Sequence, residues 1–299
     1  MSQTPSFQGI FPPLTTPFAA DGSVDLAALA ENSKKYNRTK LAGYVVVGST
    51  GESVYLREEE KVKIWETVRT AADPAKILIA GTGCEATRDT IELSCRAAAL
   101  GYQAALVRTP AYFKPQMTDA ALESHFRAVA DASPIPVLIY SVPQFTGLGV
   151  TAPLVARLAE HPNIAGIKES SGNVQLVGEI LRLTPPTFQV LVGSATTLYP
   201  SLCLGAGGGV LAVACALPEL CAELFLAACQ GDHARARALQ QRLLEPTVAV
   251  TSRFGIAGLK FAMEVRGYAG GLPRAPLQSV DAAAKAELTR IFRALDAPG

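Results

Sequence analysis

Short, wholly apolar segments alternate along the chain with longer segments whose apolar residues recur every three or four positions. The first pattern predicts strands buried on both faces, and the second predicts amphipathic helices. Strands are predicted at residues 9–14, 44–47, 77–80, 104–108, 137–140, 165–168, 189–192 and 208–213. Helices are predicted at residues 25–36, 57–71, 86–100, 118–130, 151–160, 173–183, 195–204 and 218–228. Asp25, Thr118 and Thr151 stand at N-cap positions, and Pro218 stands in a first turn.

This alternation predicts an α/β fold, a (β/α)8 barrel over residues 1–230. A doubly wound open sheet is the alternative, but it needs a phosphate-binding loop after an early strand. The segment from Gly81 to Ala86 matches that loop poorly, because alanine stands where its last glycine belongs. Residues 231–299 add predicted helices at 232–244, 255–265 and 279–295, which we expect to pack on the barrel as one structural unit.

Composition argues against several classes of protein. Hydrophobic residues make up 49% of the 299 residues and charged residues 18%, which suits a large core and disfavours disorder. The net charge is +1 without a basic stripe, so we expect neither nucleic-acid nor membrane-surface binding. The N-terminus has no apolar leader, and the most apolar stretch, 205–229, is broken by Pro218, Glu219 and Glu223. A cytoplasmic protein is therefore expected.

Cysteines and histidines point to no metal site. The six cysteines form no C-x-x-C pair and fall in apolar segments, so reduced, buried thiols are expected. His125, His161 and His233 lack metal-ligand spacing, and no carboxylates cluster at the predicted strand ends. We therefore expect no metal.

Candidate chemistry gathers at the strand ends, where barrels of this kind place their active sites. Lys168 closes the sixth predicted strand and Tyr140 the fifth. A lysine there either reaches solvent or, in a dry site, loses its proton readily and attacks carbonyls. Tyr140 is either a core aromatic or a proton relay for that amine.

Hydroxyls and glycines occupy most of the other strand ends. Ser49 and Thr50 follow the second strand, either as an ordinary tight turn or as a site for a small carboxylate. Tyr112 follows the fourth strand and is otherwise a simple loop aromatic. The glycines at 207–209 favour close backbone packing over a phosphate site, because no arginine or lysine stands beside Gly193 or Gly207.

Three motifs together resemble the dihydrodipicolinate synthase / N-acetylneuraminate lyase superfamily, class I aldolases and lyases that act through a pyruvate Schiff base. They are Gly-Ser-Thr-Gly-Glu at 48–52, Tyr-Ser-Val-Pro at 140–143 with Thr-Gly at 146–147, and Gly-Ile-Lys-Glu-Ser at 166–170. The similarity extends from Pro-Pro-Leu-Thr-Thr-Pro-Phe at 12–18 to the C-terminal helices.

The resemblance implies a role for each candidate. Lys168 would form the imine with a keto acid, and Tyr140 would relay protons. Ser49 and Thr50 would hold the pyruvate carboxylate. Tyr112 would reach in from a neighbouring subunit, which implies a homo-oligomer, a dimer of dimers. The pyruvate pocket would be lined by the backbone near Gly193 and Leu211. No metal or organic cofactor is implied, because the imine supplies the electrophile.

The resemblance does not identify the aldehyde substrate. Dihydrodipicolinate synthases usually have an arginine at the position of Phe145, and that arginine helps to bind the carboxylate of the aldehyde substrate. They usually have an asparagine at the position of Ser141. Other stretches resemble 4-hydroxy-2-oxoglutarate aldolases, in which Ser170 is a site residue, although Thr50 replaces their common asparagine. These stretches lie at 140–143, 161–164, 188–195, 253–260 and 270–277.

We therefore expect a lyase that cleaves or forms a 4-hydroxy-2-keto acid with pyruvate as product or donor, most nearly a 4-hydroxy-2-oxoglutarate aldolase. The alternatives are a 4-hydroxy-tetrahydrodipicolinate synthase, a sugar-acid aldolase or dehydratase, and a non-catalytic keto-acid binding protein.

Overall fold

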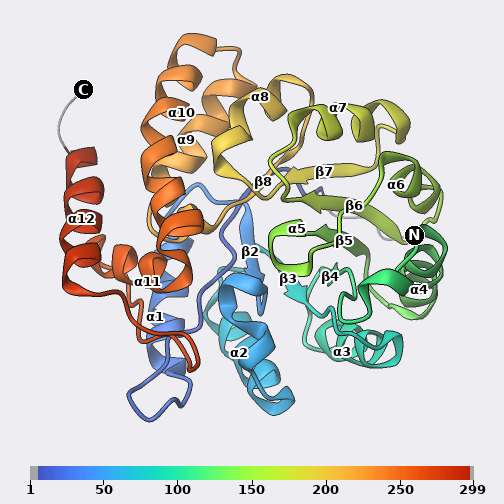
Figure 1. Cartoon of the computed structure of the whole chain (residues 1–299), viewed down its shortest axis with the longest axis horizontal. Coiled ribbons are helices and arrows are strands. Elements are labelled where there is room, and N and C mark those ends of the chain that lie inside the picture. The colour runs from blue at the N-terminus through green and yellow to red at the C-terminus, as the bar shows by residue number, and fades with distance from the viewer. Residues whose placement is uncertain (1–5, 297–299) are drawn as a thin grey trace.

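The computed structural model describes residues 6–296 and folds them into a (β/α)8 barrel (Figure 1). Its eight described strands are β1 Gly9–Phe11, β2 Gly43–Val46, β3 Ile77–Gly81, β4 Ala104–Arg108, β5 Val137–Ser141, β6 Ile164–Glu169, β7 Gln189–Val192 and β8 Gly208–Val210. They pair in the order β1-β8-β7-β6-β5-β4-β3-β2, and every ladder is parallel. The Ala42 and Val45 amides donate to the Ile10 and Pro12 carbonyls at 3.0 and 3.1 Å, which brings β2 back to the segment of β1. The predicted barrel is confirmed.

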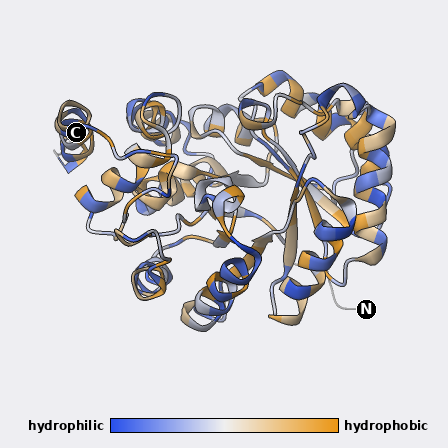
Figure 2. Ribbon diagram, turned by 60° about the horizontal axis from the view of Figure 1, so that its bottom comes forward, coloured by the Kyte–Doolittle hydropathy of each residue, from blue (hydrophilic) through white to orange (hydrophobic). Residues whose placement is uncertain are grey.

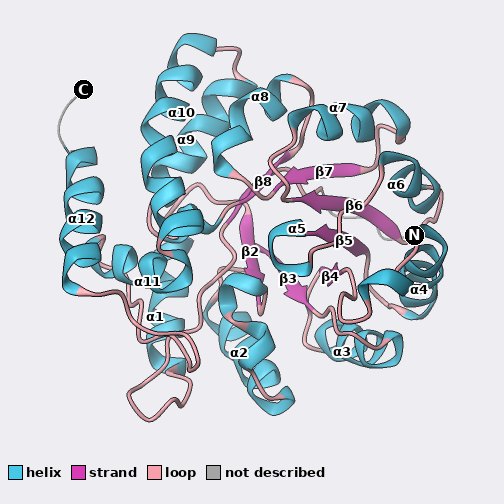
Figure 3. Cartoon of the chain, viewed as in Figure 1, coloured by secondary structure: helices cyan, strands magenta, loops and turns pink. Residues whose placement is uncertain are grey.

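Helices surround the strands (Figure 3). They are α1 Leu26–Asn37, α2 Glu58–Ala71, α3 Thr87–Ala99, α4 Asp119–Ala132, α6 Ala152–Ala159, α7 Val174–Leu183, α8 Leu198–Cys203 and α9 Pro218–Cys229. The predicted caps are confirmed, because the side chains of Asp25, Thr118 and Thr151 accept backbone amides at the starts of α1, α4 and α6.

Two apolar layers hold the barrel together, one inside the ring of strands and one between strands and helices. The inner layer includes Phe11, Ile79 and Leu138. The outer layer includes Ile139 and Ile167, which alternate along the strands with inward side chains. Figure 2 shows hydrophobic residues along the strands and hydrophilic residues mostly on the helices. Tyr140 belongs to the inner layer, so the fold itself directs this side chain into the barrel.

Two strands, β1 and β8, end three residues earlier than predicted. β1 stops at Phe11 because Pro12 and Pro13 have no amide hydrogen to donate to a ladder. β8 stops at Val210 and gives way to a 3-10 turn, η5 Ala212–Cys215. Leu211 therefore lies just beyond β8 rather than near the middle of a strand, and its amide donates to the Phe11 carbonyl at 3.1 Å.

Three more helices follow the barrel: α10 His233–Val248, α11 Gly255–Val265 and α12 Ala282–Arg293. The predicted end of the first at residue 244 is wrong, because α10 continues through Pro246 and into a π-helical turn, η6 Ala249–Arg253. A proline removes one hydrogen bond from a helix, and here a wider turn follows it. The helix predicted at 195–204 is likewise split into a 3-10 turn, η4 Ala195–Thr197, and α8.

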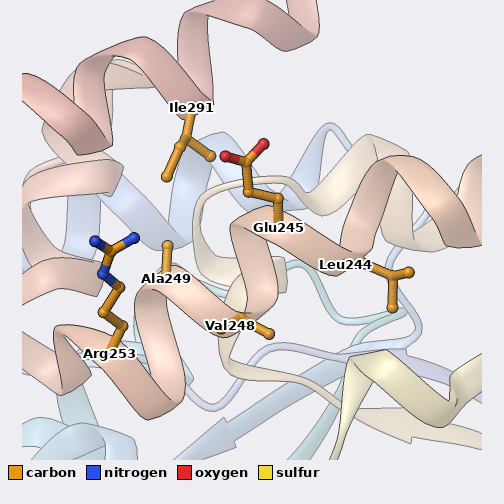
Figure 4. A pocket seen from close by; sticks show the side chains of 6 residues that line it. All are labelled: Leu244, Glu245, Val248, Ala249, Arg253 and Ile291. Atoms are coloured by element: carbon orange, nitrogen blue, oxygen red, sulfur yellow. The ribbon is translucent and has the colours of Figure 1, made fainter.

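A groove of about 280 Å³ lies between α10, η6 and α12 (Figure 4). It is lined by Leu244, Glu245, Val248, Ala249, Arg253 and Ile291. None of the candidate site residues lines it, so this hollow belongs to the C-terminal helices and not to the predicted site.

The expectation that the cysteines are buried is wrong for four of them. Cys215 and Cys221 are buried, whereas Cys203 and Cys229 are exposed and Cys84 and Cys95 are partly exposed. Cys203 and Cys229 are the last residues of α8 and α9, where the chain turns away from the packed face. All six are free thiols, as expected.

Within residues 6–296 no helix has the length and hydropathy to cross a membrane. The predicted absence of an apolar leader concerns a segment that lies mostly in residues 1–5, outside the described residues.

His125 gives the fold a pH dependence. Its ring is buried on α4 with Nδ1 2.9 Å from Thr87 Oγ1, and burial lowers the pKa of His125 to about 4. The unfolded chain therefore binds a proton, between about pH 6.5 and 4, that the folded chain does not bind, so stability falls as pH drops through this window. The gap between the two values corresponds to at most about 3 kcal/mol.

We expect a His125→Asn variant to lose less unfolding free energy than the wild type when the pH falls from 7 to 4.5, as measured by urea denaturation. His233→Asn is the control, because His233 is exposed at the start of α10 and should leave the pH dependence unchanged. Parallel curves for the wild type and His125→Asn would contradict this account.

Candidate active site

Lys168 and Tyr140 lie side by side at the carboxyl ends of β6 and β5. They are direct partners in the parallel ladder, and Lys168 Nζ lies 4.0 Å from the centre of the Tyr140 ring. Each residue is only 5% exposed. The lysine side chain is therefore largely buried and is not the solvated strand end that the sequence left open as an alternative. Its amine lies against an aromatic face inside the barrel mouth.

Ser170 and Gly193 form one wall beside the lysine. Ser170 is 7% exposed, and its Oγ has no hydrogen-bond partner among the described residues. A Cβ atom on Gly193 would lie 1.9 Å from Ser170 Oγ, so only glycine allows this close approach. An unpaired hydroxyl in a buried setting is available to bind a ligand.

Ser49 and Thr50 lie across the mouth from Lys168. They belong to η1 Ser49–Gly51, which follows β2, and both are partly exposed. In the closed ring three strands separate β2 from β6 on either side, so their carboxyl ends face each other. The two hydroxyl residues are therefore placed opposite the amine.

The turn that carries these hydroxyls is held in an unusual backbone conformation. Val47 and Glu52, on either side of it, have φ angles of 63° and 57°, which non-glycine residues rarely adopt. A Cβ on Gly51 would lie 3.0 Å from the Leu14 carbonyl oxygen, and Thr16 Oγ1 donates to the Gly51 carbonyl at 2.7 Å. The surrounding structure thus fixes this strained turn against the segment after β1.

Leu211 is fully buried where β8 ends. A Cβ on Gly209 would lie 2.9 Å from Leu211 Cδ2, so the glycine leaves room for the leucine side chain. This pair closes the part of the barrel mouth between β7 and β1.

Tyr112 and Phe145, by contrast, are largely exposed in the single chain, at 81% and 68%. The Tyr112 ring packs edge-on against Phe113, with ring centres 5.0 Å apart. Phe145 lies on α5 Pro143–Thr146, a short helix that the sequence analysis did not predict. Gln144 on the same helix donates to the Ser170 carbonyl at 2.5 Å, which ties α5 to the loop after Lys168.

The sequence analysis missed a row of buried polar atoms behind the site. Thr109 Oγ1, Ser141 Oγ and Glu169 Oε2 are buried without a hydrogen-bond partner among the described residues. Arg108, Tyr140 and Lys168 are paired across β4, β5 and β6, and Tyr140 faces inward. Each of the three buried polar residues directly follows one of them and therefore faces outward. Burial raises the pKa of the Glu169 carboxyl. The alternation of strand side chains was the signal that could have identified this row.

Among residues 6–296 no group of three or more His, Cys, Asp or Glu side chains could hold a metal ion.

Comparison with known proteins places the chain in a family. A profile of the dihydrodipicolinate synthetase family matches residues 6–295. The chain is 35% identical to the 4-hydroxy-tetrahydrodipicolinate synthase of Archaeoglobus fulgidus, over 97% of this chain and 99% of the relative. It is 38% identical to the synthase of the same name from Methanothrix thermoacetophila, over 96% of each.

Solved structures give the same result. The dihydrodipicolinate synthase of Aquifex aeolicus superposes with a TM-score of 0.92 at 31% identity, covering 98% of this chain and 99% of the other. A prophage protein of the dihydrodipicolinic acid synthase family from E. coli K12, solved in complex with pyruvate, superposes with a TM-score of 0.91 at 30% identity, covering 97% and 99%.

The chain therefore belongs to the dihydrodipicolinate synthetase family, and its chemistry is that of a pyruvate-dependent class I lyase. Both of the relatives named above are 4-hydroxy-tetrahydrodipicolinate synthases, whereas the sequence analysis favoured a 4-hydroxy-2-oxoglutarate aldolase.

We expect Gly193→Ala to lower the free energy of unfolding by about 1–3 kcal/mol, because the new methyl group must displace Ser170. Adding Ser170→Gly should recover part of this loss, since the nearest remaining atom of that residue is its Cα at 3.0 Å. Gly178→Ala is the matched control: in α7 its Cβ would meet only Leu204 Cδ1 at 3.5 Å, and it should be neutral or slightly stabilising. Equal stability of Gly193→Ala and the wild type would show that the wall is not packed in this way.

Proposed function

We propose that the chain binds pyruvate as an imine on Lys168 and uses the derived enamine in aldol chemistry with a small aldehyde. The observation that carries this proposal is the buried Lys168 amine, 4.0 Å from the Tyr140 ring centre, in a family of pyruvate-dependent lyases. An amine held away from water and next to a phenol has both the nucleophile and the proton relay that imine chemistry needs.

In the synthetic direction, Lys168 loses its proton and attacks the ketone carbon of pyruvate. The carbinolamine oxygen takes a proton relayed by Tyr140 and leaves as water, which gives a protonated imine. The imine draws electrons from the methyl carbon, which loses a proton to the Tyr140 phenolate and becomes the enamine carbon. That carbon forms a bond to the aldehyde carbon, while the aldehyde oxygen takes a proton from Tyr140. Water then hydrolyses the new imine, which releases the product and the free amine and returns a proton to Tyr140. Cleavage runs through the same steps in reverse.

The rest of the site suits the carboxylate of pyruvate. Ser49 and Thr50, on the opposite side of the mouth, supply hydroxyls and the amides of a tight turn. Ser170 adds a hydroxyl without a partner among the described residues, and Gly193 and Leu211 complete the wall. Hydrogen bonds to a carboxylate are stronger than those between neutral groups, which favours a keto acid over a plain ketone.

The first candidate for the aldehyde is aspartate semialdehyde, the substrate implied by 4-hydroxy-tetrahydrodipicolinate synthase activity. Its support is the name shared by relatives that align with nearly the whole chain. A cation is also present beside α5: a Cβ on Gly147, two residues after Phe145, would lie 3.0 Å from Lys114 Nζ. Lys114 can supply a positive charge for the aldehyde's carboxylate, without the bidentate contact that an arginine at position 145 would make.

The second candidate is cleavage of 4-hydroxy-2-oxoglutarate, and the nature of residue 145 favours it. Phe145 replaces a fixed, five-donor guanidinium with an exposed aromatic ring, which weakens bidentate recognition of a carboxylate. Ser170, a site residue of that class by resemblance, lies beside the lysine.

Borohydride reduction in the presence of pyruvate tests the imine. We expect mass spectrometry to find the reduced adduct on the peptide that contains Lys168, and no adduct on that peptide in Lys168→Arg. Tyr140→Phe should still be trapped but should lose turnover by roughly 10²–10⁴-fold, because it lacks the proton relay. An unmodified Lys168 in the wild type would refute the mechanism.

A substrate panel separates the candidates. A higher kcat/KM for pyruvate with aspartate semialdehyde than for 4-hydroxy-2-oxoglutarate supports the synthase, and the reverse supports the aldolase. Phe145→Arg should shift this ratio towards the semialdehyde by about tenfold. Sugar-acid substrates belong in the same panel, and imine formation without turnover of any of them would indicate a keto-acid binding protein.

We also propose a homo-oligomer, a dimer of dimers, in which Tyr112 completes a neighbouring site. Tyr112 and Phe113 form an exposed aromatic pair, 81% and 66% accessible, of the kind that subunit contacts cover. Light scattering should give the mass of an oligomer, and Tyr112→Ala should lower activity without removing the Lys168 adduct. A fully active monomer would contradict the shared site.

A further inference from the structure

A buried ion pair joins the C-terminal helices to the turn that carries Ser49 and Thr50. Lys260 Nζ, on α11, lies 2.6 Å from Glu52 Oε1, and their side chains are 1% and 0% exposed. Glu52 directly follows the turn and has the left-handed φ of 57° noted above. The pair therefore links two segments that are far apart in the sequence at the edge of the candidate site.

Hydrogen bonds extend this pair on both sides. Lys260 Nζ also donates to the carbonyls of Thr16 and Leu272, each at 2.7 Å. Glu52 Oε2 accepts the backbone amide of Arg274 at 2.9 Å. With Thr16 Oγ1 bound to the Gly51 carbonyl, the end of the turn is held from three separate parts of the chain.

Arg274 holds the segment that follows. Its guanidinium pairs with both carboxylate oxygens of Glu60, at 2.7 and 2.6 Å, and donates to the Tyr55 carbonyl at 2.9 Å. It also lies over the Phe18 ring, 4.2 Å from the ring centre. Together with the Lys260–Glu52 pair it fixes the chain from the turn to the first helical turn of α2.

Stability alone gives no reason for charges here. Replacing a buried ion pair with apolar residues of similar volume is often neutral or stabilising, whereas removing one partner is costly. An ion pair does, however, define one geometry through its directional contacts. Both buried lysines lie over an aromatic ring, Lys260 over Phe18 at 4.6 Å and Lys168 over Tyr140 at 4.0 Å. They differ in their polar partners: among the described residues Lys260 has three oxygen acceptors close to its amine, and Lys168 has none.

We propose that Glu52 and Lys260 are positioning residues that set the Ser49–Gly51 turn for the carboxylate of the keto acid, so that the C-terminal helices control its affinity. The inference rests on the proposed role of Ser49 and Thr50. It predicts a defect in carboxylate recognition and not in the reactivity of Lys168.

The test compares two ketones in the borohydride trap. In Lys260→Met and in Glu52→Gln, we expect the pyruvate concentration that gives half-maximal labelling of Lys168 to rise at least tenfold. Labelling by hydroxyacetone, a ketone without a carboxylate, should stay within twofold of the wild type. Combining the two substitutions should add little to the effect of either, because both disturb the same contact.

Controls separate positioning from damage to the fold. Arg290→Met removes an exposed ion pair with Glu245 from the same C-terminal helices and should leave both ketones unaffected. Glu52→Gln keeps the size of the side chain and an acceptor for the Arg274 amide, so it decides the test if Lys260→Met does not fold. Thermal unfolding of each variant establishes that labelling is measured on folded protein.

Two outcomes overturn the inference while leaving the proposed function intact: unchanged pyruvate labelling in the folded variants, and an equal loss with both ketones. Absence of a pyruvate adduct in the wild type overturns the proposed function and this inference with it.

Discussion

The chemistry proposed for this protein depends on the burial of one amine against one aromatic ring. Lys168 has no acidic partner among the described residues and is only 5% exposed, and its position follows from the ladder that pairs it with Tyr140. Because both residues sit on strands of a packed barrel, neither can move far without disturbing the inner apolar layer. The rigid fold therefore holds the side chains of the site in a fixed arrangement before a substrate binds.

The remaining parts of the site lie on loops, and each loop is anchored by a different device. Ser170 approaches the backbone of Gly193, where any side chain would collide with it. The Ser49–Gly51 turn is held by the buried ion pair between Glu52 and Lys260 of α11 and by the Thr16 hydroxyl, which donates to the Gly51 carbonyl. Lys260 in turn donates to the Thr16 carbonyl. The segments that could meet a second substrate, around Tyr112 and Phe145, are the exposed ones.

Much of this arrangement could be predicted from the sequence, and the failures have physical reasons. Buried parallel strands leave uninterrupted apolar runs, so the barrel and the placement of Lys168 were predictable. The helix that carries Phe145, α5, could not be predicted, because its four residues are too few to show a helical period. Proline usually marks the end of a helix, but α10 continues past Pro246. Whether a helix continues past a proline depends on tertiary packing, which the local sequence does not show. The contact between Glu52 and Lys260 joins segments that no local pattern connects.

The most direct test of the account is the exchange of pyruvate methyl protons for deuterium in heavy water, followed by NMR without any aldehyde present. An enamine on Lys168 returns solvent deuterium to the methyl carbon, so the methyl signal should decay with the wild-type protein and persist with Lys168→Arg. A wild-type signal that decays no faster than in buffer would contradict the central claim, whatever the aldehyde partner is.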